Sequence, residues 1–251
     1  ADRLKLIADM CRANTLTSVK IAGSGHLGSS FSAMDIVVYL YYKVMNIIEK
    51  GPEHPDRDIY FSSKGHDVPG LYSLLHSIGI IPEEKLLMLR RFGGLDGHPD
   101  VAIPGIEVNS GSLGMGISKG KGFAIAKKLK KSGGEVFVLT GDGELQEGQI
   151  FEALQTVPHQ NINNLTVIVD HNKVQSDKKV SQILDLNDLE AKFASFGWYV
   201  KRCSGHDFNQ LKDVFLDCSQ VEDQPKIIIA DTIKGRGISF FEHPQAMAAN
   251  N

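Results

Sequence analysis

The sequence predicts an α/β fold in which a mostly parallel central sheet is covered by helices on both sides. Short runs rich in Ile and Val, apolar on both faces as a covered sheet requires, alternate with stretches that have helical periodicity. The 251 residues are 42% hydrophobic and 23% charged, which is sufficient for one sizeable core. Without an internal repeat, linker or low-complexity block, we expect a single domain over residues 1–251, with a mobile tail from about residue 238.

The first hundred residues are expected to be mainly helical. Apolar side chains at helical spacing predict a helix from Leu4 to Val19, and a second helix, apolar nearly all round, begins at about Ser32. A short strand is expected at residues 59–62, followed by helices at residues 71–78 and 82–92. The last of these has proline in its first turn, where the missing N–H costs little.

The remaining sequence alternates between strands and helices. We expect strands at residues 135–139, 165–169, 198–203 and 226–231, and helices at 117–130, 146–157, 189–196 and 208–218. Gly120 and Gly122 each lower the helix propensity of their segment by about 1 kcal/mol relative to alanine. Close packing of another backbone against these glycines would explain their presence.

Charge and cysteine content exclude several classes of protein. A net charge of −3 argues against a nucleic-acid-binding protein, and the lysines between Lys119 and Lys131 are interpreted as a solvated helix face. The three cysteines lack metal or redox spacing, which indicates a reducing compartment. No stretch approaches the ~18 apolar residues that cross a bilayer, and the first residues predict an amphipathic helix instead of a signal peptide. We therefore expect a cytoplasmic protein with no membrane or nucleic-acid partner.

Polar, mostly glycine-containing clusters follow four of the predicted strands. Ligands of an open parallel sheet bind outside the carboxyl ends of its strands, so these clusters are expected to line one edge. The clusters are Lys64-Gly65-His66, Gly141-Asp142-Gly143, Asp170-His171-Asn172 and Lys234-Gly235-Arg236.

Two of these clusters predict a magnesium site. Asp142 and Asn172 present hard oxygen ligands at the ends of successive strands, and the backbone carbonyl of Val174 is placed to add a third. Gly141 and Gly143 allow a phosphate to approach the backbone, and the helix that follows directs N–H groups toward it. Two diphosphate oxygens would bring the ion close to six-coordination. A Gly-Asp-Gly tripeptide alone is more often a turn without an ion.

The order of the loops resembles the N-terminal, diphosphate-binding domain of transketolases. Gly-Asp-Gly after one strand, paired with an asparagine at the end of the next about thirty residues on, is the thiamine-diphosphate fingerprint. The resemblance spans about Leu4 to Gly237 and implies the three-layer α/β/α thiamine-diphosphate-binding fold. It rests on Ser24-Gly25-His26, Lys64-Gly65-His66, Gly97-His98-Pro99, Gly111-Ser112-Leu113-Gly114, Gly141-Asp142-Gly143 with Glu147-Gly148, and Ser204-Gly205-His206-Asp207.

The resemblance implies a role for each loop. The residues that correspond to ligands of Mg²⁺ or Ca²⁺ are Asp142, Asn172 and Val174. Those that correspond to thiamine diphosphate contacts are His66, Gly111, Ser112, Leu113, Asp142, Gly143, Glu147 and Asn172. The positions of catalytic residues are occupied by His26, His66, His98 and Glu147.

Two of these assignments have a plain chemical reason. Cleaving a ketose beside its carbonyl requires a proton to leave a hydroxyl, which suits histidines such as His26 and His98. Taken singly, each histidine is more often a surface or turn residue. Glu147 corresponds to the glutamate that meets the activating glutamate of a neighbouring domain, and it also suits the first turn of a helix. Asp207 matches a structural motif of the family, to which we assign no chemistry.

Transketolases are far longer than this chain, and their cofactor lies between this domain and a second one that binds the pyrimidine ring. The resemblance therefore implies half an enzyme, either the N-terminal subunit of a split transketolase with a separate C-terminal subunit or a fragment. A heterotetramer or other oligomer is expected, since the apolar helix at residues 33–42 requires a covered surface. A domain interior would cover that helix equally well.

Three positions depart from the family pattern. Leu27 replaces a common proline, Met115 stands where glutamine is usual, and His243 is not equated with the family histidine beyond the last strand. These departures allow a divergent donor or acceptor, so sugar phosphate substrates are an expectation. Lys234 and Arg236 are candidates to neutralise a phosphate, or else solvated surface charges.

Three alternatives to a split transketolase share parts of this pattern. A related synthase half, similar to deoxyxylulose-phosphate synthase, would share the cofactor loops. A non-catalytic interaction module would keep the fold, but it need not retain Asp142, Asn172 and the three loop histidines. A dinucleotide-binding domain is disfavoured because no Gly-x-Gly-x-x-Gly motif opens a helix after the first strand.

Overall fold

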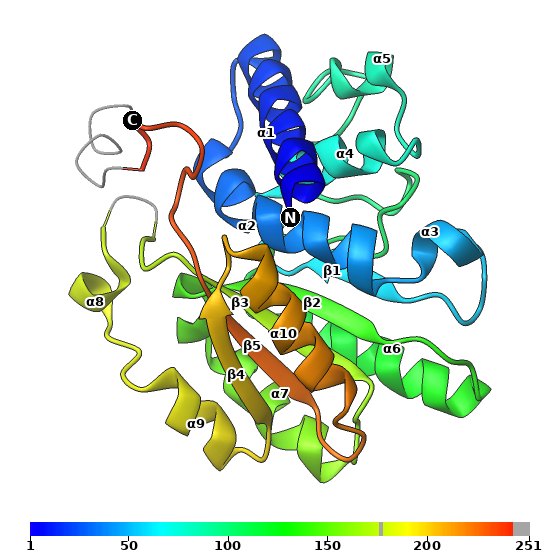
Figure 1. Cartoon of the computed structure of the whole chain (residues 1–251), viewed down its shortest axis with the longest axis vertical. Helices are drawn as coiled ribbons and strands as arrows, with labels where there is room; N and C mark the ends of the chain where they lie inside the picture. Colours follow the sequence, from blue (N-terminus) through cyan, green and yellow to red (C-terminus); the bar gives the residue numbers. More distant parts are fainter. Residues whose placement is uncertain (176–177, 243–251) are drawn as a thin grey trace.

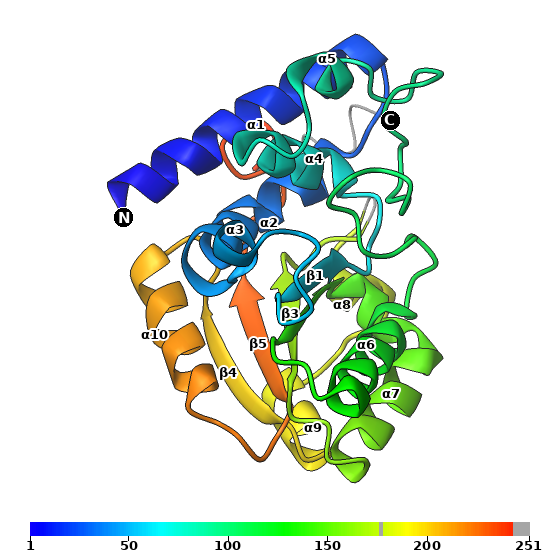
Figure 2. The ribbon, with the colours of Figure 1, turned by 90° about the vertical axis from the view of Figure 1, so that its right-hand side faces the viewer.

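The computed structural model describes residues 1–175 and 178–242. Within them, five parallel strands form one sheet in the order β1-β2-β3-β5-β4 (Figure 1). The predicted fold class is confirmed, because helices cover both faces of this sheet (Figure 2). The strands are β1 (Ile59–Ser62), β2 (Val136–Gly141), β3 (Leu165–His171), β4 (Tyr199–Ser204) and β5 (Lys226–Asp231).

Alternate residues of the strands point into two separate apolar cores. In β2, Phe137 and Leu139 belong to the core beneath α1 (Asp2–Ala22), α2 (Leu27–Tyr39), α4 (Val68–Ser77) and α10 (Phe208–Ser219). Val136 and Val138 belong to the other core, beneath α6 (Gly116–Lys130), α7 (Gly148–His159) and α9 (Leu189–Ser195). Burial on both faces explains why the strands are apolar throughout.

The second helix starts at Leu27, so the predicted start near Ser32 is wrong. Serines in its first turns bond to nearby backbone groups: Ser30 Oγ donates to the carbonyl of His26, and Ser32 Oγ donates to that of Ser29. The apolar helix is covered within the chain by α1, α4 and α10. A domain interior, the second of the two expected ways to cover it, is therefore what the structure shows. It continues through the π-helical turn η1 (Leu40–Val44) toward α3 (Ile47–Lys50).

The predicted helix at residues 82–92 is also wrong, since α5 covers only Glu83–Leu86. Pro82 precedes this helix in an extended conformation. Leu89 is buried and pairs with Leu95 through an isolated bridge, and Arg90 has a left-handed backbone (φ 55°). The chain therefore turns back here instead of continuing as a helix.

The second half of the chain follows the predicted alternation closely, with β5 as expected and β4 shifted by one residue. The helix expected from residue 146 is preceded by a 3-10 turn, η2 (Gly143–Gln146), and a short α8 (Val180–Ile183) follows β3. Asp207 caps α10, because its side chain accepts hydrogen bonds from the N–H groups of Asn209 and Gln210.

Two expectations about α6 need correction. A Cβ atom at Gly120 would lie 2.6 Å from Val138 Cγ2, so this glycine is required by close packing, although against a side chain. Gly122 has no neighbour within 4 Å, and packing does not explain it. Lys127 is buried, not solvated: its ammonium group donates to the carbonyls of Pro55, Arg57 and Gly133, which no local pattern predicts.

The three cysteines are free and buried. In the described part of the chain no helix is long and apolar enough to span a membrane. Of the expected mobile tail, residues 239–241 form a turn, and residues 243–251, including His243, lie outside the described residues.

Candidate functional site

The loops at the carboxyl ends of the strands surround a cavity of about 680 Å³. It is lined by parts of all four predicted clusters, so the expectation that they meet at one edge is confirmed. The first turn of α2 closes a further side. The lining residues include Lys64 and His66 after β1, Gly141, Asp142 and Gly143 after β2, Asn172 and Val174 after β3, Lys234 after β5, and residues 25–29 around the start of α2.

The three candidate metal ligands lie together at this edge. Asp142 is buried, and its carboxylate accepts hydrogen bonds from the N–H groups of Gly143 (2.7 Å) and Lys173. Asn172 Oδ1 accepts a hydrogen bond from the N–H of Val174 at 3.1 Å. Burial and the charge of Asp170 raise the pKa of Asp142 to about 6. A cation beside this carboxylate would stabilise its ionised form.

The donor set also indicates the kind of ion. One carboxylate, one amide and one backbone carbonyl are hard oxygen ligands of the type that Mg²⁺ and Ca²⁺ prefer. Among the described residues, no group of three or more His, Cys, Asp and Glu side chains is arranged to hold a metal. The set therefore fits a hard cation that completes its coordination with ligand oxygens.

A phosphate-bearing group fits the rest of the cavity. Ser29 lines it and is buried, yet its hydroxyl has no hydrogen-bond partner among the described residues. A buried hydroxyl without a partner costs about 1–3 kcal/mol, so a ligand oxygen would be favourable here. A Cβ at Gly65 would lie 2.5 Å from Gly111 Cα, which shows that the two loops touch backbone to backbone.

Glu144 holds these loops together, although the sequence pattern did not identify it as a site residue. Its buried carboxylate accepts hydrogen bonds from Ser63 Oγ, from the N–H of Gly114 (2.8 Å) and from the N–H of Gly141 (3.1 Å). Burial raises the pKa of Glu144, which these three donors partly offset. The side chain thereby links the turn at residues 111–116 to the Asp142 loop. The only sequence signal was a second acid near Glu147.

A buried ion pair lies beneath the cavity. Lys64 Nζ is 2.7 Å from Asp170 and 3.1 Å from Asp67. Asp170 also accepts hydrogen bonds from Ser32 Oγ (2.6 Å) and Thr232 Oγ1. Burial alone would raise the pKa of Asp170, but Lys64 and these hydrogen bonds outweigh it and hold the pKa below its usual value. The sequence places Lys64 and Asp170 in the clusters that follow β1 and β3, but it indicates no role for either charge.

The three predicted histidines are close to one another. The rings of His26 and His66 meet edge to face, with centroids 5.1 Å apart. A Cβ at Gly111 would lie 2.6 Å from His98 Cδ2, so His98 packs on the predicted cofactor turn. Burial, followed by the charges of Arg90 and His98, lowers the pKa of His26. Burial lowers the pKa of His66 to about 4, so both rings are neutral near pH 7.

Comparison with known proteins identifies the family. Residues 4–249 match the thiamine diphosphate binding domain of transketolase. The chain belongs to the transketolase family. It is 34% identical over 242 residues to a subunit of the apulose-4-phosphate transketolase of Phocaeicola vulgatus, in a match that covers 96% of this chain and 86% of that protein. It is 35% identical to 6-deoxy-6-sulfo-D-fructose transketolase subunit SqwG of Clostridium sp., covering 94% and 86% of the two chains.

Solved transketolases have the same fold. The transketolase from Leishmania mexicana superposes with a TM-score of 0.90 at 28% identity, covering 97% of this chain but 38% of that one. Human transketolase is 35% identical and is likewise covered over only 39% of its length. This transketolase-family chain thus spans most of the two relatives named as transketolase subunits and well under half of the single-chain transketolases.

The remaining predicted site residues lie around the Asp142 loop. Glu147 is exposed and precedes the first residue of α7. A Cβ added at Gly114 would lie 2.6 Å from Glu147 Cβ. Glu147 therefore lies beside the turn that contains Ser112 and Leu113. Leu113 lines the cavity and is partly exposed. The structure therefore brings the predicted cofactor contacts together, with Glu147 at the outer surface.

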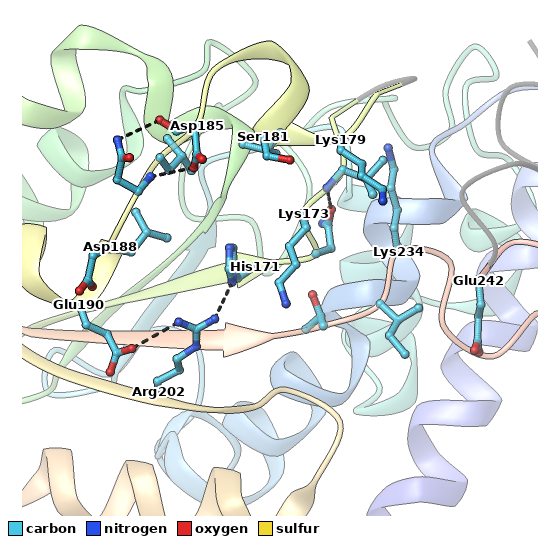
Figure 3. Close-up of a pocket in the computed structure, with 18 residues that line it drawn as sticks. His171, Lys173, Lys179, Ser181, Asp185, Asp188, Glu190, Arg202, Lys234 and Glu242 are labelled. Atoms are coloured by element: carbon cyan, nitrogen blue, oxygen red, sulfur yellow. Dashed lines mark hydrogen bonds and ion pairs between the residues drawn. The ribbon is translucent and has the colours of Figure 1, made fainter.

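A second cavity, of about 670 Å³, adjoins the first and shares Asn172, Val174 and Lys234 with it. Lys173, Lys179 and Lys234 lie around it, with Glu242 beyond Lys234 (Figure 3). On the opposite side, Arg202 binds Asp231 and Glu190. Lys234 is thus the cationic side chain that lines both cavities.

Proposed function

We propose that this chain is the thiamine-diphosphate-binding, N-terminal subunit of a split transketolase. Together with a C-terminal, pyrimidine-binding subunit, it transfers a two-carbon ketol unit from a ketose donor to an aldose acceptor. The observation that carries this proposal is the cavity where Asp142, Asn172 and Val174 meet the loops of His26 and His66. We also propose that the chain acts as one domain in the cytoplasm, which its three free cysteines support.

In this proposal the carboxyl edge holds the cofactor. Asp142, Asn172 and the Val174 carbonyl bind Mg²⁺ or Ca²⁺, and the ion carries the diphosphate. His66, Gly143 and residues 111–113 contact the cofactor, and the orphaned Ser29 hydroxyl donates to one of its oxygens. When bound, the thiazolium ring supplies an electron sink for cleavage of the bond beside a carbonyl.

The histidines bind the sugar and move its protons. His26 and His98 face the donor, and a neutral His26 accepts a proton from a donor hydroxyl as the carbon–carbon bond breaks. Its lowered pKa supports this role, because the ring is free to take a proton near pH 7. Neutral His66 binds the cofactor without adding a charge beside the cation.

In this proposal a partner subunit completes the site. We propose that it provides the glutamate that activates the pyrimidine ring, and that exposed Glu147 meets it at the interface. The relatives that this chain matches over most of their length are named as subunits, which supports a separate partner chain. A heterotetramer or other oligomer follows from two such half-sites.

The substrates are proposed to be acidic sugars. The two relatives named above are designated for apulose 4-phosphate and 6-deoxy-6-sulfo-D-fructose, which carry a phosphate and a sulfonate respectively. Arg236, which follows β5, suits such a charge once its 3.5 Å ion pair with Glu242 opens.

Co-purification from the native source, followed by product analysis, tests this proposal. We expect a second chain to co-purify, and the complex to transfer two carbons from a ketose phosphate or sulfonate to an aldose. Consumption of pyruvate instead would favour the synthase alternative. A complex that binds thiamine diphosphate but turns over neither donor would contradict a catalytic role.

A further inference from the structure

The segment after β5 brings Lys234 to the cavity. The stem of Lys234 packs on the first turn of α2, where a Cβ at Gly28 would lie 3.1 Å from Lys234 Cγ. The N–H of Gly235 donates to the carbonyl of Gly28 at 3.0 Å. The ammonium group itself donates to the carbonyl of Gln175 at 3.0 Å, so its position depends on this bond and on how the segment is held against α2.

His206 contacts this segment without lining either cavity. Its Nε2 lies 2.9 Å from the backbone N of Ile233, and its Nδ1 lies 2.7 Å from Asp35 Oδ2. Because a backbone N–H can only donate, Nε2 accepts and the ring carries its hydrogen on Nδ1. His206 thus donates to Asp35 and accepts from Ile233 through opposite sides of one ring.

The other end of this link is fixed in the helical layer. Asp35 is buried on α2, and Arg12 of α1 binds both of its oxygens, at 3.1 and 2.6 Å. Burial would raise the pKa of Asp35, but the hydrogen bonds from His206 and Arg12 outweigh it and keep the carboxylate ionised. Since His26 directly precedes α2 and Ser29 lies in its first turn, the link joins them to the segment of Lys234.

We propose that His206 is a positioning residue for Lys234, which it places relative to the start of α2 by holding the backbone N–H of Ile233. The inference rests on the proposed function, because it gives the Lys234 ammonium group an anionic ligand, the cofactor diphosphate. It assigns a role to the Ser-Gly-His-Asp loop, for which the sequence indicated only a structural motif.

Two substitutions separate the two sides of the ring. His206→Asn retains an N–H group near the position of Nδ1, so it preserves the bond to Asp35 and loses the acceptor for Ile233. His206→Gln places its carbonyl oxygen near the position of Nε2, so it preserves the acceptor and loses the donor to Asp35. His159→Asn, at an exposed histidine, is the matched control.

Limited trypsin digestion, read by mass spectrometry, measures how firmly the segment is held, because Lys234 and Arg236 are cleavage sites within it. We expect cleavage there to be roughly 10-fold faster in His206→Asn, and within about 2-fold of the unmodified chain in His206→Gln and His159→Asn. Thermal unfolding of each variant is measured in parallel. A merely structural role would make cleavage follow the melting temperature, and equal cleavage in the Asn and Gln variants would overturn the proposal.

Titration of the complex with thiamine diphosphate and Mg²⁺ tests the link to the ligand. We expect His206→Asn to raise Kd by about 3- to 10-fold with kcat unchanged at saturation, and His206→Gln to restore most of the affinity. Faster cleavage with unchanged Kd would overturn the assignment of Lys234 to the ligand. An unmodified complex that binds no thiamine diphosphate would contradict the proposed function itself, whereas the trypsin result, which needs no cofactor, would still decide whether His206 holds the segment.

Discussion

The two edges of the sheet use buried charges differently. At the amino edge, Asp58 accepts hydrogen bonds from the N–H groups of Asn46 (2.9 Å) and Glu135 (2.7 Å), and Lys127 donates to three carbonyls. At the carboxyl edge, the pKa of Asp142 is raised, and the hydroxyl of Ser29 has no partner among the described residues. The charges at the amino edge are satisfied by hydrogen bonds among the described residues, whereas the carboxyl edge has capacity for a ligand.

This difference can be tested with a pair of aspartates. Asp142→Asn is expected to weaken Mg²⁺-dependent binding of thiamine diphosphate by at least about 100-fold, because the one charged side chain among the three proposed protein ligands of the ion is lost. The unfolding free energy should change by less than about 1 kcal/mol, because burial already disfavours the ionised carboxylate of Asp142 and its replacement by a neutral amide removes that cost. Calorimetric titration and urea unfolding measure the two quantities.

Asp58→Asn is the matched control at the opposite edge. It should lower the unfolding free energy by about 1–3 kcal/mol, because one of two backbone donors loses its charged acceptor, while binding stays within about 2-fold. If both variants lowered binding equally, the contrast between the edges would be wrong.

A pair of glutamates tests how the cofactor loops are held. Glu144→Gln should lower the unfolding free energy by about 1–3 kcal/mol and weaken cofactor binding roughly 10-fold, because it disturbs the acceptor of three donors. Thermal unfolding and titration measure both. Glu147→Gln, three residues on and exposed, should leave the stability of this subunit unchanged and lower only the activity of the assembled enzyme. A stability loss in Glu147→Gln that equalled that of Glu144→Gln would contradict these roles.

Sequence reasoning succeeded where the pattern is local. Apolar runs identified all five strands of the described sheet, and strand direction brought Asp142 and Asn172 to one edge. It failed where a contact joins distant parts of the chain. Ser32 bonds to Asp170, 138 positions away, and Ser63 bonds to Glu144, 81 positions away, so the roles of Asp170 and Glu144 do not follow from neighbouring residues.

The lysines of α6 show the same distinction. Their spacing predicts a solvated face, which holds for exposed Lys128, but two of the three carbonyls that bond to Lys127 come from the loop before β1. The cluster of His206, Asp35 and Arg12 likewise combines three elements that no periodicity connects. Local pattern thus locates the cofactor edge, and tertiary contacts determine how its loops are held.

Lys127→Met tests whether a residue at the amino edge affects stability but not cofactor binding. It should lower the unfolding free energy by about 1–3 kcal/mol, because three part-buried hydrogen bonds to backbone carbonyls are lost, with no change in cofactor affinity. Urea unfolding of this variant beside Lys128→Met, which should remain within about 0.5 kcal/mol of the unmodified chain, provides the check. Weaker cofactor binding in Lys127→Met would show that the two edges are coupled.

The smallest expected effect is the pH dependence contributed by His66. Its pKa is about 4 in the folded chain and about 6.5 when unfolded, so the unfolded state binds more protons between these values. This contribution is therefore fully present above about pH 6.5 and is lost as pH falls toward 4, by about 1–2 kcal/mol at pH 5. NMR titration of the ring, with urea unfolding of His66→Gln at pH 5 and 7.5, measures it. A midpoint near 6.5 would contradict the buried, neutral ring.

The central claim is that the carboxyl edge holds thiamine diphosphate through a divalent cation. Isothermal titration of the co-purified complex with thiamine diphosphate, in Mg²⁺ and after removal of metal with EDTA, tests it most directly. We predict binding in Mg²⁺ that disappears with EDTA, returns with Mg²⁺ or Ca²⁺, and does not return in Asp142→Asn. Binding that is indifferent to EDTA, or no binding in the presence of Mg²⁺, would contradict the claim.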